Sequence, residues 1–212
     1  MKGKGEKVKT RSSPRLKKGL VEVYTGNGKG KTTAALGLAL RALGAGLKVC
    51  VIQFLKGAKR YGEHKIAKRL APQLKIIQTG RGCIFAKSKK DVDCEECYKR
   101  HGYLPCHVDP KNPQKIDYRL AQDALNLSKK RVASGKYDLV ILDEISIALK
   151  YKLINLKEVI KMIKEKPKNV ELILTGRGMP KEIIAIADLV SEVREVKHPF
   201  SRGISARQGI EY

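Results

Sequence analysis

A glycine- and lysine-rich segment, TGNGKGKTT at residues 25–33, has the residue types and the spacing that bind phosphate. It follows an apolar stretch and precedes one rich in alanine and leucine, so the expected order is strand, loop, helix. Glycines let backbone N–H groups crowd around phosphate oxygens, and the following helix N-terminus adds a favourable dipole. The pattern predicts a nucleoside triphosphate site formed by Gly26, Asn27, Gly28, Lys29, Gly30, Lys31, Thr32 and Thr33. Lys31 is expected to reach the terminal phosphates, and the Thr32 hydroxyl to bind Mg²⁺.

One position of this loop is irregular. The usual pattern has a glycine where this chain has Thr25, and Gly26 and Gly28 supply the flexibility instead.

Two acidic residues, Asp143 and Glu144, follow the apolar run 137–142. A carboxylate at the end of a buried strand that neighbours the phosphate loop is suited to hold Mg²⁺, which prefers few carboxylates together with water and phosphate oxygens. The alternative is an acid at a helix start, where it favours the helix dipole. Because the phosphate loop is present, we predict Mg²⁺ binding by Thr32, Asp143 and Glu144.

Basic residues occur in two further loops. Arg177 lies between two glycines after an apolar run, and its guanidinium can bind two phosphate oxygens at once. Lys56 in the segment QFLKG faces either an anion or solvent.

Strand and helix patterns alternate along most of the chain, which indicates a parallel α/β sheet with right-handed crossovers. Strands are expected at 20–24, 47–55, 74–79, 137–142, 170–175 and 189–196. Helices are expected at 32–43, 63–70, 116–133, 156–165 and 180–187, with Asn155 and Glu158 as a capping box. Ligands of such sheets bind at the carboxyl ends of strands, so the loops 25–32, 53–63, 143–150 and 175–180 are expected to surround one pocket.

Composition indicates one globular domain. The chain has 212 residues, of which 42% are hydrophobic, and a formal net charge of +24. No apolar run is long enough to span a bilayer and no secretory signal is evident, so we expect a cytoplasmic protein.

Residues 1–18 carry eight Lys or Arg and one Glu without apolar periodicity, and are expected to form a mobile tail, either a solvated leader or a polyanion-binding arm. Residues 19–212 form the predicted domain.

A cysteine-rich insert interrupts the strand and helix pattern at about 81–114. It contains Cys83, Cys94, Cys97 and Cys106, with two histidines nearby. The CxxC pair followed by a further cysteine has metal-ligand spacing, so the four thiolates are candidates for a structural Zn²⁺ site or an Fe–S cluster. Reduced cysteines without a shared role are the alternative. Cys50 in the second strand is expected to be a core residue.

Several motifs together resemble the P-loop type of ATP:corrinoid adenosyltransferase. The resemblance covers residues 19–79 and 116–212 and rests on YTGNGKGKTTAA (24–35), VIQFLKG (51–57), VILDE (140–144), LTGRG (174–178), EVKHPF (195–200) and QGIEY (208–212). It implies a homodimeric, RecA-like P-loop NTPase fold, a three-layer α/β sandwich with a mainly parallel sheet and, in this chain, the cysteine-rich insert. Thr25 is also what the family carries at that position.

The resemblance further implies transfer of the 5′-deoxyadenosyl group of ATP to a reduced cobalt(I) corrinoid, with release of tripolyphosphate. Residues 26–33 then bind the triphosphate, Thr32 and Glu144 hold Mg²⁺, Arg177 contacts phosphate, and a separate reductase supplies cobalt(I). Cobalt(I) is itself a strong nucleophile, so the enzyme needs no nucleophile of its own; it stabilises the leaving group through Lys31, Thr32 and Glu144. Family members place aromatic residues near the corrin soon after the equivalent of Thr79, where this chain departs from the pattern and offers Phe85.

Two other hypotheses remain at this point. One is a RecA-like, nucleic-acid-binding ATPase with a zinc module, which the positive charge and the cysteines favour although no aromatic residues are interleaved with the basic tail. The other is a nucleotide-binding regulatory protein descended from the enzyme.

Overall fold

Six strands, all parallel, form one sheet in the order β3-β2-β4-β5-β1-β6. This computed structural model describes residues 15–57, 62–81 and 108–211. The strands are β1 (Val21–Thr25), β2 (Val49–Gln53), β3 (Leu74–Gln78), β4 (Leu139–Asp143), β5 (Glu171–Thr175) and β6 (Leu189–Glu192). The predicted parallel α/β sheet is therefore confirmed.

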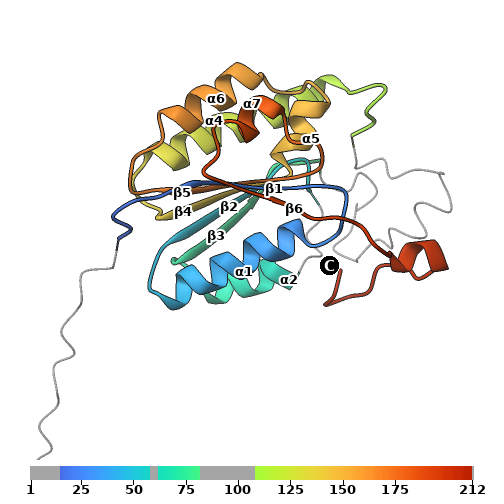
Figure 1. Cartoon of the computed structure of the whole chain (residues 1–212), viewed down its shortest axis with the longest axis horizontal. Helices are drawn as coiled ribbons and strands as arrows, with labels where there is room; N and C mark the ends of the chain where they lie inside the picture. The colour runs from blue at the N-terminus through green and yellow to red at the C-terminus, as the bar shows by residue number, and fades with distance from the viewer. Residues whose placement is uncertain (1–14, 58–61, 82–107, 212) are drawn as a thin grey trace, which may run out of the picture.

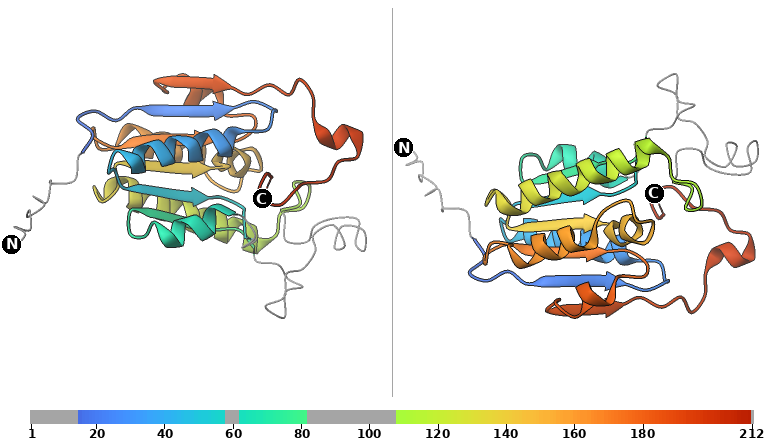
Figure 2. Two further views of the ribbon diagram at one scale, coloured as in Figure 1. Left: turned by 90° about the horizontal axis from the view of Figure 1, so that it is seen from below. Right: turned by 90° about the horizontal axis from the view of Figure 1, so that it is seen from above.

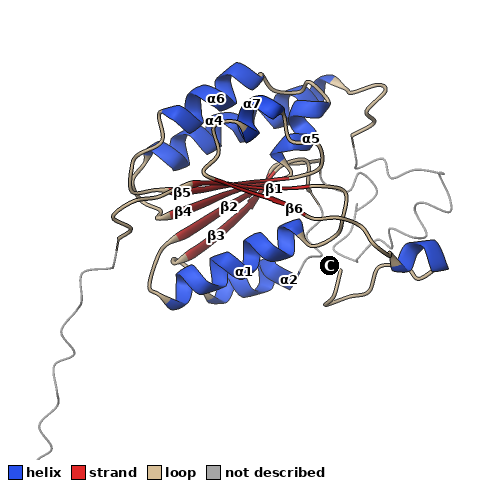
Figure 3. Ribbon diagram, in the orientation of Figure 1, coloured by secondary structure: helices blue, strands red, loops and turns tan. Residues whose placement is uncertain are grey.

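Helices cover both faces of the sheet, which makes three layers (Figures 1 and 3). One face carries α1 (Lys31–Gly44) and α2 (Gly62–Arg69). The other carries α4 (Lys115–Ala133), α5 (Ile145–Lys150), α6 (Leu156–Lys164) and α7 (Lys181–Ile184). After β6 the chain leaves the sheet and forms a 3₁₀ helix, η1 (Pro199–Arg202).

Successive side chains of the central strands point to opposite faces of the sheet, so the core consists of two clusters, one on each face. All residues of β2 and β4 are buried, as expected for strands covered on both sides. Val49 and Val51 pack in the cluster that includes the buried alanines of α1, whereas Cys50 and Ile52 pack in the cluster that includes α4 and α6. Cys50 is thus the core residue that the sequence predicts.

Helix α1 packs on the sheet through residues spaced at helical intervals. Its buried residues are Lys31, Ala35, Ala39 and Ala42. Alanine at three of these positions lets the helix approach β4 and β5 closely, which places its N-terminus at the carboxyl ends of the strands.

β4 ends beside the phosphate loop, as the sequence predicts, because Asp143 accepts from Thr32 there, although β5 lies between β4 and β1 in the sheet. The structure corrects two details of the sequence interpretation. The predicted loop 143–150 contains helix α5. Asn155 does cap α6 by accepting from the Lys157 N–H at 2.8 Å, but the carboxylate of Glu158 pairs with Lys129 of α4 rather than completing a capping box.

The predicted tail and insert fall mostly outside the described residues. This applies to residues 1–14 of the tail, and to Phe85 and the four cysteines Cys83, Cys94, Cys97 and Cys106. Within the described ranges, residues 108–114 contain neither helix nor strand. No helix in these ranges has the length and apolarity that a membrane crossing requires.

An acidic pair lies at the amino-terminal side of the sheet, between the strand of the phosphate loop and its neighbour. Glu171 Oε2 accepts from the Leu20 N–H at 2.7 Å, and Glu22 accepts from the Tyr24 hydroxyl at 2.6 Å. Burial, and a hydrogen bond and like charge from Glu22, raise the pKa of Glu171 to about 7. Ionised Glu171 therefore works against the pairing of β1 with β5.

The folded pKa of Glu171 lies above the value of 4.5 expected for an ordinary glutamate, so its contribution to stability is present at low pH and is lost as the pH rises from about 4.5 through about 7. Glu171→Gln keeps an oxygen for Leu20 and removes the charge. We expect this variant to melt at a higher temperature than the wild type at pH 8, with a smaller difference at pH 5. Glu182→Gln, on the exposed surface of α7, is the control. Melting curves of Glu171→Gln that shift equally at both pH values contradict the argument.

Candidate active site

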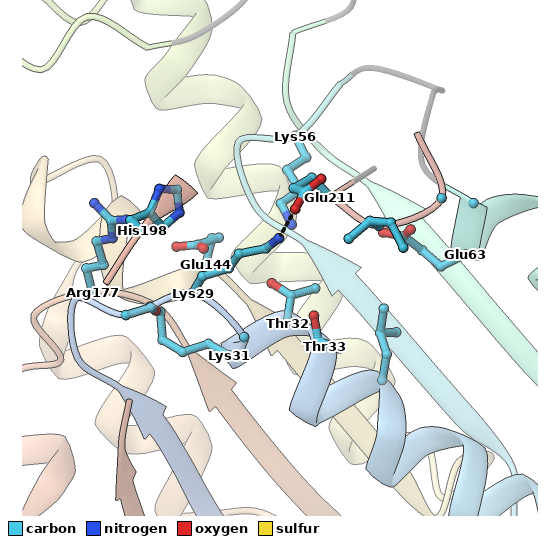
Figure 4. A pocket seen from close by; sticks show the side chains of 16 residues that line it. Lys29, Lys31, Thr32, Thr33, Lys56, Glu63, Glu144, Arg177, His198 and Glu211 are labelled. Carbon is cyan, nitrogen blue, oxygen red and sulfur yellow. Dashed lines mark hydrogen bonds and ion pairs between the residues drawn. The ribbon is translucent and has the colours of Figure 1, made fainter. Parts of the chain in front are cut away.

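A pocket of about 500 Å³ opens at the carboxyl ends of the strands (Figure 4). The C-terminal segment lies on the same side of the sheet (Figure 2). Its walls come from the phosphate loop, α1, the loop after β2, the start of α2, the ends of β4 and β5, and the C-terminal segment. The lining residues are Gly28, Lys29, Gly30, Lys31, Thr32, Thr33, Leu36, Lys56, Gly62, Glu63, Glu144, Arg177, His198, Gly209, Ile210 and Glu211.

The phosphate loop connects β1 to α1 as the sequence predicts. Gly30 precedes the helix with φ 119°, a left-handed conformation that favours glycine. The Lys31 ammonium donates to the carbonyl oxygens of Gly26 at 2.8 Å and Gly28 at 2.7 Å. Burial lowers the pKa of Lys31, while the nearby carboxylates of Glu144 and Asp143 oppose that shift. A partly desolvated cation at this place is ready to exchange carbonyl oxygens for phosphate oxygens.

The irregular residue of the loop, Thr25, ties two loops together. Its hydroxyl donates to the Gly176 carbonyl at 3.0 Å and accepts from the Met179 N–H at 3.3 Å. The turn itself begins at Gly26, where φ is 95° and a Cβ atom would lie 2.4 Å from the Val193 carbonyl oxygen. The positive φ that requires glycine is therefore at Gly26 and not at Thr25, and the Thr25 side chain joins the phosphate loop to the segment after β5.

Asp143 is the buried centre of the site. Its side chain has no exposed surface; Oδ1 accepts from the hydroxyls of Thr32 and Thr175, both at 2.7 Å, and Oδ2 accepts from Lys56 at 2.7 Å. These three donors come from α1, β5 and the loop after β2. A buried carboxylate is tolerated because each oxygen has hydrogen-bond donors.

Glu144 presents the second carboxylate, and its backbone is strained. Its φ of 62° is in the left-handed region, which a glutamate rarely adopts. Its N–H donates to the Thr175 hydroxyl at 3.0 Å, which holds this conformation. Burial, and then the like charge of Asp143, raise the pKa of Glu144, and Lys56 and Lys31 only partly offset the rise.

The donor set at this wall fits a divalent cation. The Thr32 hydroxyl, Asp143 and Glu144 supply only oxygen, as Mg²⁺ prefers. Among the described residues no three His, Cys, Asp or Glu side chains form a metal cluster.

Arg177 reaches the pocket from the loop after β5. Its backbone carbonyl accepts from the Ser146 hydroxyl at 3.0 Å, and its side chain lies beside His198 on one side of the pocket (Figure 4). Gly176, with φ 133°, is needed here because a Cβ atom would lie 2.0 Å from the Ser146 Oγ. Glu63 lies on the opposite side, with Thr32 and Thr33 between.

A buried amide connects Asp143 to the Glu63 side of the pocket. Gln53, with no exposed surface, donates to Glu63 Oε1 at 3.1 Å and to Asp143 Oδ2 at 3.5 Å. Its Oε1 lies 3.0 Å from His64 Nε2 and accepts from Gln78 at 3.2 Å. The start of α2 is therefore held against the acidic centre.

Most of the residues singled out from the sequence meet at this pocket. Those that line it are Gly28, Lys29, Gly30, Lys31, Thr32, Thr33, Glu144, Arg177 and Lys56. Gly26 and Asn27 do not line it, and Asp143 lies beneath the lining. Sequence reasoning missed the roles of Thr175, Glu63 and Glu211. The role of Thr175 could have been predicted from its place in the sequence, because it is a hydroxyl residue that ends an apolar strand directly before the Gly-Arg-Gly loop.

Known proteins that resemble this chain over almost its whole length are corrinoid adenosyltransferases. The family model "ATP:corrinoid adenosyltransferase BtuR/CobO/CobP" matches residues 17–212. The corrinoid adenosyltransferase of Escherichia coli is 34% identical over 208 residues, covering 98% of this chain and 93% of the relative. Corrinoid adenosyltransferase CobA of Salmonella typhimurium is 34% identical over 214 residues, covering 98% and 95%. Among solved structures, a KaiC-like protein from Pyrococcus horikoshii matches with a TM-score of 0.43 and 17% identity, over 85% of this chain and 74% of that chain.

The Thr175 hydroxyl gives a direct test of this arrangement. Thr175→Val keeps the shape but removes the donor to Asp143 and the acceptor for the Glu144 N–H. We expect it to lower the free energy of unfolding by about 1–3 kcal/mol, the cost of leaving buried polar groups unpaired. Thr175→Ser, which keeps the hydroxyl, should lose about 0.8 kcal/mol for the missing methyl group. Equal losses in urea unfolding of the two variants contradict a role for the hydroxyl.

Proposed function

The chain belongs to the ATP:corrinoid adenosyltransferase family, and from this premise we propose how its residues divide the work of the reaction. The enzyme transfers the 5′-deoxyadenosyl group of ATP to the cobalt(I) of a reduced corrinoid. The cobalt electron pair forms a bond to C5′ of the ribose, the C5′–O bond breaks, and its electrons leave with tripolyphosphate. The alternative of a nucleic-acid-binding ATPase is not favoured, because the relatives that match almost the whole chain are corrinoid adenosyltransferases.

In this proposal the phosphate loop holds the leaving group. Lys31 turns from the carbonyls of Gly26 and Gly28 to the phosphate oxygens, and Arg177 and Lys29 bind further oxygens. These cations stabilise the negative charge that develops on tripolyphosphate as the C5′–O bond breaks. The observation that carries the proposal is that Lys31, Thr32 and Glu144 line one wall of a pocket, directly above buried Asp143.

A bound Mg²⁺ belongs to the same proposal. Thr32 and Glu144 would hold it, with Asp143 accepting from the Thr32 hydroxyl beneath. The ion would supply positive charge to the leaving phosphate oxygens. The strained backbone of Glu144 keeps its carboxylate at this wall, and the hydrogen bond to Thr175 maintains that strain.

We also propose that the protein is a homodimer and that a separate reductase supplies the cobalt(I) corrinoid. A second copy of the chain would cover the exposed apolar side chains of β6 and of the segment after it, which are Leu189, Val190, Val196, Phe200, Ile204 and Ile210. A molar mass of one chain in light scattering would reject the homodimer. A RecA-like relationship and a separate reductase that supplies cobalt(I) rest on the family resemblance, and a cytoplasmic location rests on the apolar pattern of the sequence.

The adenosylation assay tests the leading function. Protein mixed with ATP, Mg²⁺ and chemically reduced cobalamin should form a light-sensitive cobalt–carbon product in the visible spectrum, and omission of Mg²⁺ should suppress it. Lys31→Ala should lower kcat by about 100- to 1,000-fold, because it removes a preorganised donor to the developing charge. Lys161→Ala, exposed on α6 in the opposite layer, is the matched control and should retain the rate. Nucleic-acid-stimulated phosphate release without a cobalt–carbon product would instead support the RecA-like ATPase.

The cysteine-rich insert keeps its own hypothesis, a structural Zn²⁺ or an Fe–S cluster bound by Cys83, Cys94, Cys97 and Cys106. Elemental analysis of purified protein should find about one Zn²⁺ per chain, or cluster iron, because a structural site of four thiolates is nearly filled. Replacement of Cys94 and Cys97 by serine should remove the metal. Purified wild-type protein without either metal rejects the four-cysteine site.

A further inference from the structure

The chain after β6, residues 193–211, leaves the phosphate loop and later returns to it; we name this segment the C-terminal strap. At its start, the Val193 N–H donates to the Thr25 carbonyl at 2.9 Å, and the Val193 carbonyl accepts from the Gly28 N–H at 2.8 Å. At its end, Glu211 Oε1 lies 2.6 Å from the Lys29 ammonium, an ion pair drawn as a dashed line in Figure 4. The strap thus forms one wall of the pocket.

The end of the strap is organised around the Glu211 carboxylate. Oε2 accepts from the Arg207 backbone N–H at 2.7 Å, and Oε1 accepts from the Arg207 guanidinium at 3.2 Å. The N–H groups of Ile210 and Glu211 donate to the Arg207 carbonyl at 3.2 and 2.9 Å. The hydrogen bonds from Arg207 and Lys29 hold the pKa of Glu211 near 2, so its carboxylate is charged throughout the physiological range.

Between its two ends the strap has little support from the rest of its own chain. Val196 is 89% exposed and Phe200 is 75% exposed. Apart from the contacts of Val193 and Glu211, the hydrogen bonds of residues 194–210 within the described part of the chain join residues of the strap and β6 to one another. The Lys29 side chain is 42% exposed and the Glu211 side chain 17% exposed, and an ion pair that is open to solvent on one side contributes little to stability, so the Glu211 end is the one that detaches most easily.

Triphosphate competes directly with Glu211 for Lys29. Lys29 belongs to the phosphate loop, and phosphate oxygens form strong charge-assisted hydrogen bonds with an ammonium group. A ligand shifts a conformational equilibrium only by binding one state better, and here ATP binds better once Lys29 has left Glu211.

We propose that Glu211 is a positioning residue that holds Lys29 away from the triphosphate site, and that ATP takes over Lys29 and so releases the strap. This inference rests on the proposed function, since it requires ATP at the phosphate loop. Release of the strap removes one wall of the pocket. A pocket of about 500 Å³ accommodates one small-molecule ligand, so the opened wall admits the corrinoid as the second substrate. ATP therefore binds before the corrinoid.

Hydrogen–deuterium exchange measures both halves of this inference in one experiment on the full chain. On addition of Mg²⁺ and ATP, amides of residues 26–33 should exchange more slowly, which reports nucleotide binding. Amides of residues 207–211 should exchange faster, because the end of the strap loses its attachment to Lys29 and its local hydrogen bonds then open more often. Slower exchange in residues 26–33 with unchanged or slower exchange in residues 207–211 overturns the strap inference and leaves the proposed function intact. Unchanged exchange in residues 26–33 overturns both.

Substitution of Glu211 separates the positioning role from a local structural one. Glu211→Gln should tighten binding of tripolyphosphate alone by about two- to fivefold, the range expected on removal of one exposed competing ion pair. It should lower KM for ATP rather than raise kcat. Glu195→Gln removes the same charge from an exposed position on the strap and is the matched control.

The double variant completes the test. In a Lys29→Gln background, Glu211→Gln should leave tripolyphosphate affinity unchanged, because Glu211 acts through Lys29. Unchanged affinity in the Glu211→Gln single variant, or an equal gain from Glu195→Gln, overturns the positioning role.

Discussion

The buried carboxylate of Asp143 is the constraint on which the rest of the site depends. It has no exposed surface and receives hydrogen bonds from Thr32, Thr175 and Lys56, which three different segments supply. Loss of any of these donors leaves part of a buried charge unpaired, which is costly. The start of α1, the end of β5 and the loop after β2 must therefore converge at the end of β4. The strained backbone of Glu144 is a consequence, because the same Thr175 hydroxyl accepts its N–H.

The site contains a buried ion pair, Asp143 with Lys56, and a separate group of positively charged side chains that line the pocket. Lys56 compensates the buried Asp143, while Lys29, Lys31 and Arg177 line the pocket, where Lys29 pairs with Glu211 and Lys31 donates to backbone carbonyls. Such a site is suited to a reaction in which the nucleophile arrives with the second substrate and the protein positions ATP and stabilises its leaving group. Neither task requires a protein nucleophile or a general base, and none is needed to account for the residues that line the pocket.

The place of β6 at the edge of the sheet explains how the C-terminal end of the chain reaches the nucleotide site. β6 pairs with β1, so the chain that leaves it runs directly beside Gly26 and Gly28 of the phosphate loop. A strap anchored there and at Lys29 gives a two-substrate enzyme a wall that responds to its first substrate. The weak support of its middle is consistent with movement, since segments with few buried contacts open at low free energy.

The sequence by itself determined the local parts of this protein. The loop 25–33, its strand and helix, the apolar strands and the acid pair at 143–144 each follow from residues close together in the chain, and the match of further motifs identified the family. Contacts between distant residues were decided only by the tertiary structure. The position of β5 between β4 and β1 made Thr175 a partner of Asp143, and the path of the strap brought Glu211 to Lys29, 182 residues away. Periodicity and spacing report which face a side chain occupies, whereas strand order and chain path depend on how all the faces pack together, so neither contact is visible in the local pattern.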